Sequence, residues 1–131
     1  MKTILVVDDE YDICSALEMI LTMEGYRVYL AYNGEDGLTS LARTPKPDLV
    51  MSDLMMPVLN GYDFVKGMRA LPEHRQVPIV LSSAGPLDVS RLEPESWQAF
   101  VRKPYDLDRL LAKIEALTVM CAIVPENFVR T

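Results

Sequence analysis

Residues 3–9 read TILVVDD, an apolar and β-branched run that ends abruptly at two aspartates. A run of this kind, without alternating polar residues, is typical of a strand that is buried on both faces of a sheet. Such strands occur in parallel sheets whose two faces are covered by helices. This stretch therefore favours the α/β class and places the two aspartates at the carboxyl end of the first strand.

The strand and the helix expected after it form a unit that repeats along the chain. Asp12 is expected to cap the first helix, and Gly25 to close it. Further strands are predicted at 27–31, 49–52, 77–82 and 99–101. Further helices are predicted at 35–43 after an Asn33-Gly34 turn, at 61–70, at 87–93, and after Asp106, which can cap the last one.

Apolar residues at helical spacing mark the faces that should pack on the sheet. They are Ile13, Ala16, Leu17, Ile20 and Leu21 in the first helix, Leu38, Leu41 and Ala42 in the second, Phe64, Val65 and Met68 in the third, and Leu107, Leu110, Leu111, Ile114 and Leu117 in the last. Regular alternation of strands and helices predicts a parallel sheet with right-handed crossovers. The expected architecture is a flavodoxin-like (βα)5 doubly wound sheet with strand order 2-1-3-4-5.

The fourth helical segment departs from this regularity. Pro86 and Pro94 leave room for only a short helix between them, because proline does not continue a helix interior. Residues 85–98 are therefore expected to be irregular or mobile.

Length and composition limit the classes of function. The 131 residues suit one domain, and 50% apolar with 24% charged residues is ordinary globular usage. The net charge of −6 and the scattered lysines and arginines argue against direct binding of nucleic acid. The longest apolar runs are far below the roughly 18 residues of a membrane span, and no signal peptide precedes the first strand. A cytoplasmic protein is expected.

The cysteines and the histidine indicate no metal or redox chemistry. Cys14 and Cys121 lie far apart, without a Cys-x-x-Cys pair or partnering histidines, so neither a zinc site nor a disulfide framework is predicted. His74, the only histidine, lies in a polar stretch and is expected to be a solvated loop residue.

Polar side chains gather where the predicted strands end. Asp8 and Asp9 follow the first strand, Asp53 the third, Ser82-Ser83 the fourth and Lys103 the fifth. In a parallel sheet ligands bind beyond this edge. Carboxylates that converge there repel one another unless a cation lies between them, and Mg²⁺ suits a small, partly hydrated carboxylate site.

A carboxylate beside such a cation can attack phosphorus and form an aspartyl phosphate. Phosphoryl transfer then needs mainly alignment and neutralisation of charge, which Mg²⁺ and the Lys103 ammonium would supply. The Ser83 hydroxyl is a candidate donor to a phosphoryl oxygen, with Ser82 as a competing candidate. A cis Lys103-Pro104 bond would help to aim Lys103 into the site, but the sequence does not show the isomer.

Four motifs, taken in order, resemble the receiver domain of two-component response regulators. They are Val6-Val7-Asp8-Asp9-Glu10, Asp53-Leu54-Met55-Met56-Pro57 with Gly61 four residues later, Ser83-Ala84, and Lys103-Pro104. The resemblance covers about residues 2 to 118. The chain is accordingly divided into a receiver domain at 1–120 and a C-terminal tail at 121–131.

The resemblance implies a role for each matching residue. Asp53 would be phosphorylated, Asp9 would bind Mg²⁺ directly, Asp8 would bind it mainly through water, and the Met55 carbonyl would be a further ligand. Ser83, favoured over Ser82 by the following Ala84, corresponds to the switch hydroxyl. Phe100, three residues before Lys103, corresponds to the switch aromatic, although an aromatic on a short strand is usually core and Tyr105 lies nearby.

The same resemblance implies the partners and the kind of activity. The phosphoryl donor would be a histidine kinase or a histidine phosphotransfer protein, and the output would be contacts with an unknown downstream protein, a second copy of the chain included. Members of the family catalyse their own phosphorylation and dephosphorylation, but they act as phosphoacceptor switches rather than as enzymes with an external substrate. Met55 and Gly85 bring no polar side chain to positions that tune hydrolysis, so the phosphoryl lifetime is not predicted.

Two other functions fit part of the pattern. A haloacid-dehalogenase-like phosphatase also uses a strand-end aspartate with Mg²⁺, a serine or threonine and a lysine, but it needs a second aspartate where this chain has Met55. A phosphorylation-independent interaction module would keep the fold without the chemistry, and the intact Asp53, Asp9 and Lys103 argue against it.

Overall fold

The structure is a computed structural model and describes residues 1–123. Its strands are β1 (Thr3–Val7), β2 (Arg27–Ala31), β3 (Leu49–Asp53), β4 (Ile79–Ser83) and β5 (Ala99–Arg102), and its α-helices are α1 (Tyr11–Met23), α2 (Gly34–Arg43), α3 (Gly61–Arg69) and α4 (Leu107–Ile123). Two 3₁₀ turns, η1 (Pro72–His74) and η2 (Val89–Arg91), complete the described elements. All strand pairs are parallel, in the order β2-β1-β3-β4-β5, which confirms the predicted topology.

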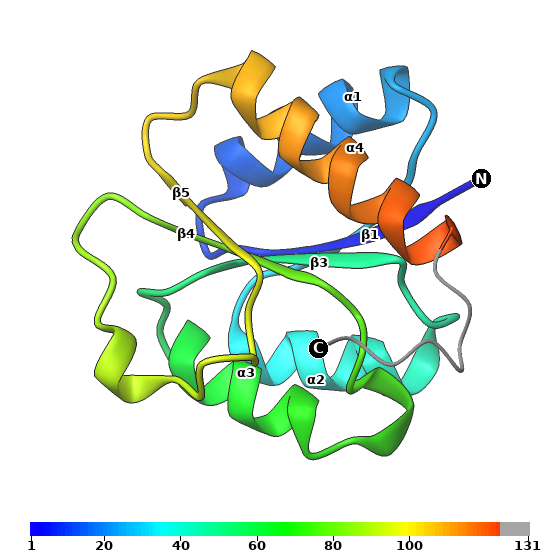
Figure 1. Cartoon of the computed structure of the whole chain (residues 1–131). Coiled ribbons are helices and arrows are strands. Elements are labelled where there is room, and N and C mark those ends of the chain that lie inside the picture. The colour runs from blue at the N-terminus through cyan, green and yellow to red at the C-terminus, as the bar shows by residue number, and fades with distance from the viewer. Residues whose placement is uncertain (124–131) are drawn as a thin grey trace.

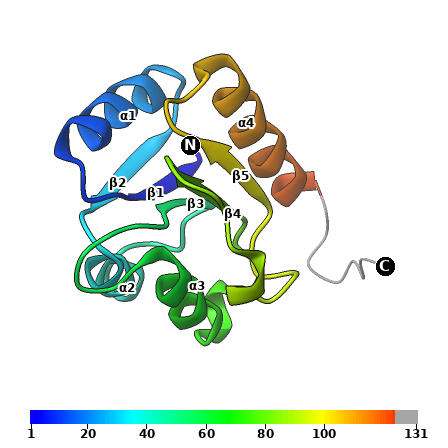
Figure 2. The same cartoon turned by 90° about the vertical axis from the view of Figure 1, so that its left-hand side faces the viewer.

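Helices cover both faces of this sheet. Helices α1 and α4 lie on one face and α2 and α3 on the other (Figures 1 and 2). Each face has its own cluster of buried side chains, because successive residues of a strand point to opposite sides. Every residue of β1, β3 and β4 is buried, as the apolar runs predicted.

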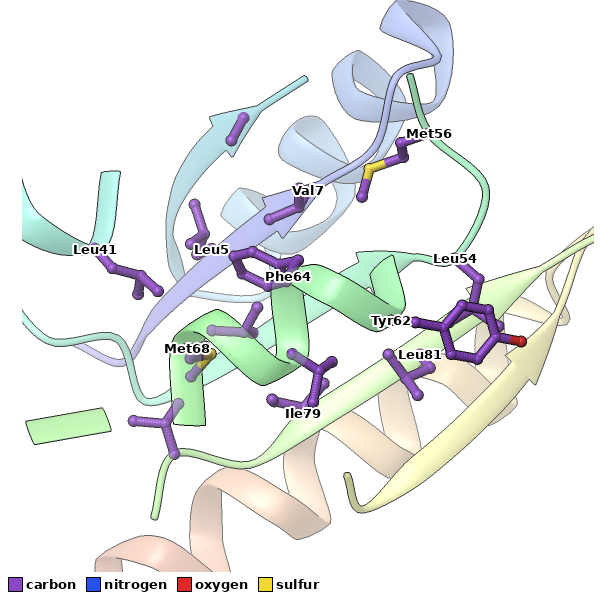
Figure 3. Close-up of a cluster of buried hydrophobic side chains, with 14 of the residues drawn as sticks. Leu5, Val7, Leu41, Leu54, Met56, Tyr62, Phe64, Met68, Ile79 and Leu81 are labelled. Atoms are coloured by element: carbon purple, nitrogen blue, oxygen red, sulfur yellow. The ribbon is translucent and has the colours of Figure 1, made fainter. Parts of the chain in front are cut away.

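Phe64 of α3 lies fully buried in the cluster under α2 and α3 (Figure 3). A Cβ on Gly37 of α2 would come within 2.7 Å of the Phe64 ring. A glycine at this position therefore lets the two helices approach closely over the sheet.

The start of α1 and one residue of its predicted buried face, Ala16, differ from the prediction. The helix begins at Tyr11 with Glu10 in the capping position, so Asp12 lies in the first turn and is not the cap. Its buried residues are Cys14, Leu17 and Leu21. Ala16 is exposed, because it lies to one side of the stripe that these three residues form. The end was predicted correctly, since Gly25 follows the helix with φ of +96°.

The N-termini of the other α-helices are capped by side chains. Asn33, which was assigned to a turn, accepts a hydrogen bond from the Asp36 N–H and caps α2. Asp106 accepts one from the Arg109 N–H at 3.2 Å, which confirms it as the cap of α4. Ala42 was expected to face the sheet but is exposed, because Leu41 alone of the last turn is directed inward.

No α-helix forms between β4 and β5. The helix predicted at 87–93 is reduced to the single turn η2, so residues 85–98 are irregular, as expected. The Asp88 carboxylate accepts hydrogen bonds from the Ser90 N–H and hydroxyl. Local bonding of this kind competes with helix formation, and Pro94 blocks extension on the other side.

His74 is buried, with 2% of its surface exposed, so its assignment as a solvated residue is wrong. His74 is buried because hydrogen bonds from Arg69 hold this stretch against the domain. The Arg69 guanidinium donates to the carbonyls of His74 (2.8 Å) and Arg75 (3.0 Å) and to that of Ser96 (2.9 Å), and so folds the polar stretch against the end of α3. Burial lowers the pKa of Arg69 from its usual range.

The last helix passes the predicted domain boundary at residue 120 and continues through Ile123. The apolar segment 119–124 therefore begins inside α4. The rest of the predicted tail, residues 124–131, lies outside the described residues, as does the side chain of Cys121.

Candidate functional site

The carboxyl ends of the strands carry the site. Asp8 and Asp9 directly follow β1, Asp53 is the last residue of β3, Ser83 is the last residue of β4, and Lys103 follows β5. Because β1, β3 and β4 are neighbours in the sheet, their ends meet at one edge.

Four carboxylates form a compact cluster at this edge. One oxygen from each of Asp8, Asp9, Glu10 and Asp53 lies within 4.8 Å of the others. Asp8 and Asp53 are buried, with 2% and 5% of their surface exposed, whereas Glu10 is exposed. The sequence predicted the three aspartates, and Glu10 joins them as a residue not singled out. Its signal was its place as the third consecutive acid after the strand.

Lys103 is the cation that faces this cluster. Its Nζ lies 2.9 Å from Asp8 Oδ2, 3.3 Å from Glu10 Oε1 and 3.4 Å from Asp53 Oδ2. Burial opposes its charge, but the hydrogen bond and the charge of Asp8 outweigh that effect and raise the pKa of Lys103 above its ordinary range. One ammonium against four carboxyl groups leaves room for a further cation.

The surroundings of the Asp53 carboxyl group disfavour its ionised form. Burial, followed by the charge of Asp8, raises the pKa of Asp53 to about 6, against the opposing effects of Lys103 and of a hydrogen bond from the Met55 backbone. A nucleophilic carboxylate must be ionised. The oxygen donors present and the raised pKa both fit a hard dication such as Mg²⁺, which would restore the charged form.

Backbone hydrogen bonds and a close approach of Gly61 fix the conformation of the loop after Asp53. The Gly61 N–H donates to the Leu54 carbonyl at 2.9 Å, and a Cβ on Gly61 would overlap the Asp53 carbonyl. The Leu59 N–H donates to the Pro57 carbonyl at 2.8 Å across Val58, whose φ is +70°. These features define a γ-turn. The Met55 side chain is exposed, so only its backbone is available to the site.

The structure separates the two candidate serines. Successive strand residues face opposite sides, and the Ser82 hydroxyl accepts a hydrogen bond from the Tyr105 hydroxyl at 3.2 Å. The Ser83 hydroxyl instead accepts one from the Gly85 N–H at 3.1 Å. Phe100 is half-buried and lies on the same sheet face as Ser83, because the register pairs Leu81 with Phe100 and Ser83 with Arg102.

Two further residues, Cys14 and Tyr105, form hydrogen bonds with residues at this edge of the sheet. The Cys14 thiol donates to the Asp8 carbonyl at 3.3 Å, and burial followed by the charge of Asp8 raises its pKa to about 11. Burial likewise raises the pKa of Tyr105 to about 12. Both side chains therefore stay neutral. Tyr105 was noted in the sequence only as a nearby aromatic.

The chain matches the response regulator receiver domain family over residues 4–115, which is most of its length. It belongs to this family.

The relatives of this receiver domain agree with that assignment. It is 34% identical over 119 residues to the response regulator ArlR of Staphylococcus aureus, covering 89% of this chain and 52% of ArlR. The chain thus spans about half the length of the curated relatives that it matches.

Solved receiver domains share the fold. The response regulator TrrA of Thermotoga maritima, solved in complex with Mg²⁺ and BeF, is 33% identical, with a TM-score of 0.79 over 89% of this chain and 99% of that one. The receiver domain of a sensor histidine kinase from Pseudomonas aeruginosa, solved with a magnesium ion in its active-site cleft, is 27% identical, with a TM-score of 0.80 over 90% and 98%. Among residues 1–123 of our receiver domain, no helix has the length and apolar character needed to cross a membrane.

Proposed function

We propose that this receiver domain is a Mg²⁺-dependent phosphoacceptor switch, in which Asp53 accepts a phosphoryl group from a histidine kinase or a histidine phosphotransfer protein. The setting of Asp53 carries this proposal. Its carboxylate is buried at the end of β3, lies within 4.8 Å of three other carboxylates and lies 3.4 Å from the Lys103 ammonium. A nucleophile, a lysine and a set of hard oxygen donors thus meet at one sheet edge.

The proposed Mg²⁺ ligands are Asp9, Asp53 and the Met55 carbonyl, with Asp8 bound mainly through water. The donor set supports this, because Mg²⁺ prefers oxygen ligands and keeps part of its water. The magnesium ions in the TrrA and Pseudomonas aeruginosa structures support it by analogy. When bound, Mg²⁺ would keep Asp53 ionised and offset charge on the phosphoryl oxygens.

Each remaining site residue has a proposed part in the transfer. An Asp53 oxygen attacks phosphorus as the bond between phosphorus and the donor histidine breaks. The Lys103 ammonium neutralises charge on the transferred group, which is the main need of this loose transition state. The Ser83 hydroxyl already accepts from the Gly85 N–H, so its own hydrogen is available for a phosphoryl oxygen. Phe100, on the same sheet face as Ser83, is the proposed second switch residue.

Turnover of external phosphoesters is not part of the proposal. The haloacid-dehalogenase-like alternative requires an aspartate where this chain has the exposed Met55, which offers no general acid. Self-phosphorylation from small donors and self-dephosphorylation are the activities that we assign to Asp53. We place the protein in the cytoplasm, where such donors act, and assign the output to contacts with a downstream protein or a second copy.

The test is to treat the protein with a small phosphoryl donor and then to measure its intact mass. With Mg²⁺ and acetyl phosphate, the wild-type protein should gain the mass of one phosphoryl group, and it should not gain it after chelation of Mg²⁺. Asp53→Ala should gain none, whereas Asp108→Asn, which alters an exposed aspartate of α4, should behave as wild type. Equal labelling of wild type and Asp53→Ala, or none of either, would contradict the proposal.

A further inference from the structure

Residues 84–98, which we name the strap, stand where the fourth helix was expected and are fastened to α3 at two places. At the C-terminal end of the strap, Ser96 and Gln98 are bound by Arg69 of α3, whose guanidinium donates to the Ser96 carbonyl at 2.9 Å and to Gln98 Oε1 at 3.3 Å. Near its start, the Asp88 N–H donates to the Tyr62 hydroxyl at 2.9 Å. The strap is thus irregular in secondary structure but has defined points of attachment.

Tyr62 is contacted by the strap twice. Besides the Asp88 bond, the Arg91 guanidinium carbon lies 4.0 Å from the centroid of the Tyr62 ring. The Asp88 carboxylate accepts from the Ser90 N–H (3.1 Å) and the Ser90 hydroxyl (2.6 Å), which shapes the turn η2 and returns Arg91 to the same ring. Figure 3 shows the Tyr62 hydroxyl pointing away from Phe64 and the centre of the core cluster. Tyr62 itself is buried, with 3% of its surface exposed.

The strap also begins at the functional site. The Gly85 N–H donates to the Ser83 hydroxyl at 3.1 Å, and only Pro86 and Leu87 separate Gly85 from Asp88. Consecutive Cα atoms are about 3.8 Å apart, and the ring of Pro86 fixes one of the few rotations in this segment. A short segment, restricted in part by the Pro86 ring, therefore links the Ser83 hydroxyl to the bond between Asp88 and Tyr62.

We propose that Tyr62 is the latch of this strap: a positioning residue that holds the strap closed and releases it when the Ser83 hydroxyl turns toward a phosphoryl group on Asp53. The turn draws Gly85 toward the site and pulls the Asp88 N–H away from Tyr62. A neutral hydrogen bond and a cation–π contact are each individually weak, so a local displacement suffices to open them. Release uncovers the apolar surface on which Leu87 and Trp97 pack.

This inference rests on the proposed function, because a phosphoryl group at Asp53 is the event that turns Ser83. The first experiment therefore measures both separately. Mg²⁺ and beryllofluoride are added to the wild-type protein, and fluorine NMR reports whether beryllofluoride binds at Asp53. Amide exchange at Asp88 and the fluorescence of Trp97, the one tryptophan of the chain, report the strap.

With beryllofluoride bound, exchange at Asp88 should rise about three- to tenfold, the equilibrium equivalent of one lost hydrogen bond, and Trp97 emission should change. Ser83→Ala lacks a proposed donor to the analogue, so beryllofluoride is added to it until fluorine NMR shows the site occupied, and at that occupancy exchange at Asp88 should not rise. Bound beryllofluoride with unchanged Asp88 exchange and unchanged Trp97 emission in the wild type would overturn the coupling. Absence of a bound fluorine signal would overturn the proposed function, and the coupling with it.

The second experiment tests the latch without any phosphoryl analogue. Tyr62→Phe keeps the ring and its contact with Arg91 but removes the acceptor for Asp88. Exchange at Asp88 should rise in this variant before beryllofluoride is added and should change little afterwards. Tyr29→Phe, which removes a tyrosine hydroxyl from the distant edge strand β2, is the matched control and should leave exchange at Asp88 unaltered. Wild-type exchange in Tyr62→Phe would overturn the assignment of Tyr62 as the latch.

Discussion

At the scale of single residues, burial and a neighbouring negative charge both disfavour ionisation of the Asp53 carboxyl group. Its carboxylate lies in a buried position beside Asp8, and one lysine does not fully compensate for that neighbour. Such a carboxylate is costly to ionise in the fold, yet it must be ionised to act as a nucleophile. A dication bound beside Asp53 would favour the ionised form, and metal affinity, pH and stability would then be linked through this one group.

Mg²⁺ binding should depend on pH through Asp53. Because the pKa of Asp53 is raised to about 6, a proton competes with Mg²⁺ below that pH and does so little above it. Mg²⁺ should bind about tenfold more weakly at pH 5 than at pH 7, measured by calorimetric titration at constant ionic strength. Asp53→Asn should lose most of this dependence. An affinity that stays constant between pH 5 and 7 in the wild type would argue against the raised pKa.

Asp53→Asn should stabilise the metal-free fold at neutral pH. The raised pKa means that the folded state holds the proton more tightly than the unfolded state, so the contribution of Asp53 to stability falls as pH rises from about 4 to about 6. At pH 7 the variant should gain about 1–2 kcal/mol, less than the full linkage value because water screens part of the effect. At pH 4 the gain should vanish.

Urea unfolding in the presence of a chelator measures both conditions. Asp108→Asn, at an exposed position of α4, serves as the control and should change the free energy of unfolding little at either pH. Equal stability of wild type and Asp53→Asn at pH 7 would show that the site does not destabilise the fold.

At the scale of elements, the turn between β3 and α3 carries backbone strain. Val58 has φ of +70° and its side chain is exposed. A β-branched residue in this region is a true outlier, and such strain costs on the order of 1–3 kcal/mol. The strain therefore lies within the loop that follows Asp53.

Val58→Asn should therefore raise stability by about 1 kcal/mol, because asparagine tolerates positive φ far better than valine does. Thermal and urea unfolding would measure the gain. The control is Val89→Asn, since Val89 is also exposed but has negative φ. If both variants change stability equally, the effect belongs to the loss of an exposed apolar side chain and not to the turn.

At the scale of the whole molecule, one sheet links the two core clusters and the site. The strand ends that carry Asp8 and Asp53 continue strands whose side chains fill both clusters. The site therefore has no scaffold of its own, and a small single domain of this kind is expected to unfold in one cooperative step.

Phe64→Ala should cost about 3–5 kcal/mol, as a large cavity in a packed core does, which is a large part of the roughly 5–15 kcal/mol of a typical domain. Circular dichroism and Trp97 fluorescence should report the same lowered urea midpoint. Tyr11→Ala, which removes an exposed ring, should cost far less. Separate transitions by the two probes would show that the strap unfolds independently of the sheet.

The amino-acid sequence by itself determined the sheet order and the meeting of Asp8, Asp9, Asp53 and Lys103. Buried strands leave a local signal in uninterrupted apolar runs, and the carboxyl ends of parallel strands meet at one edge whatever packs around them. Capping and buried faces were predicted less well, as Asp12, Ala16 and Ala42 show, because a shift of one residue in a helix leaves its periodicity almost unchanged.

Only the tertiary structure decided the burial of His74, the approach of Glu10 to Lys103 and the hold of Tyr62 on the strap. It also decided the cis isomer of Lys103-Pro104. Each depends on contacts between segments far apart in sequence, such as the Arg69 guanidinium that turns a polar stretch inward. A local pattern records how polar a residue is, but its environment is set by the partners that the fold brings to it.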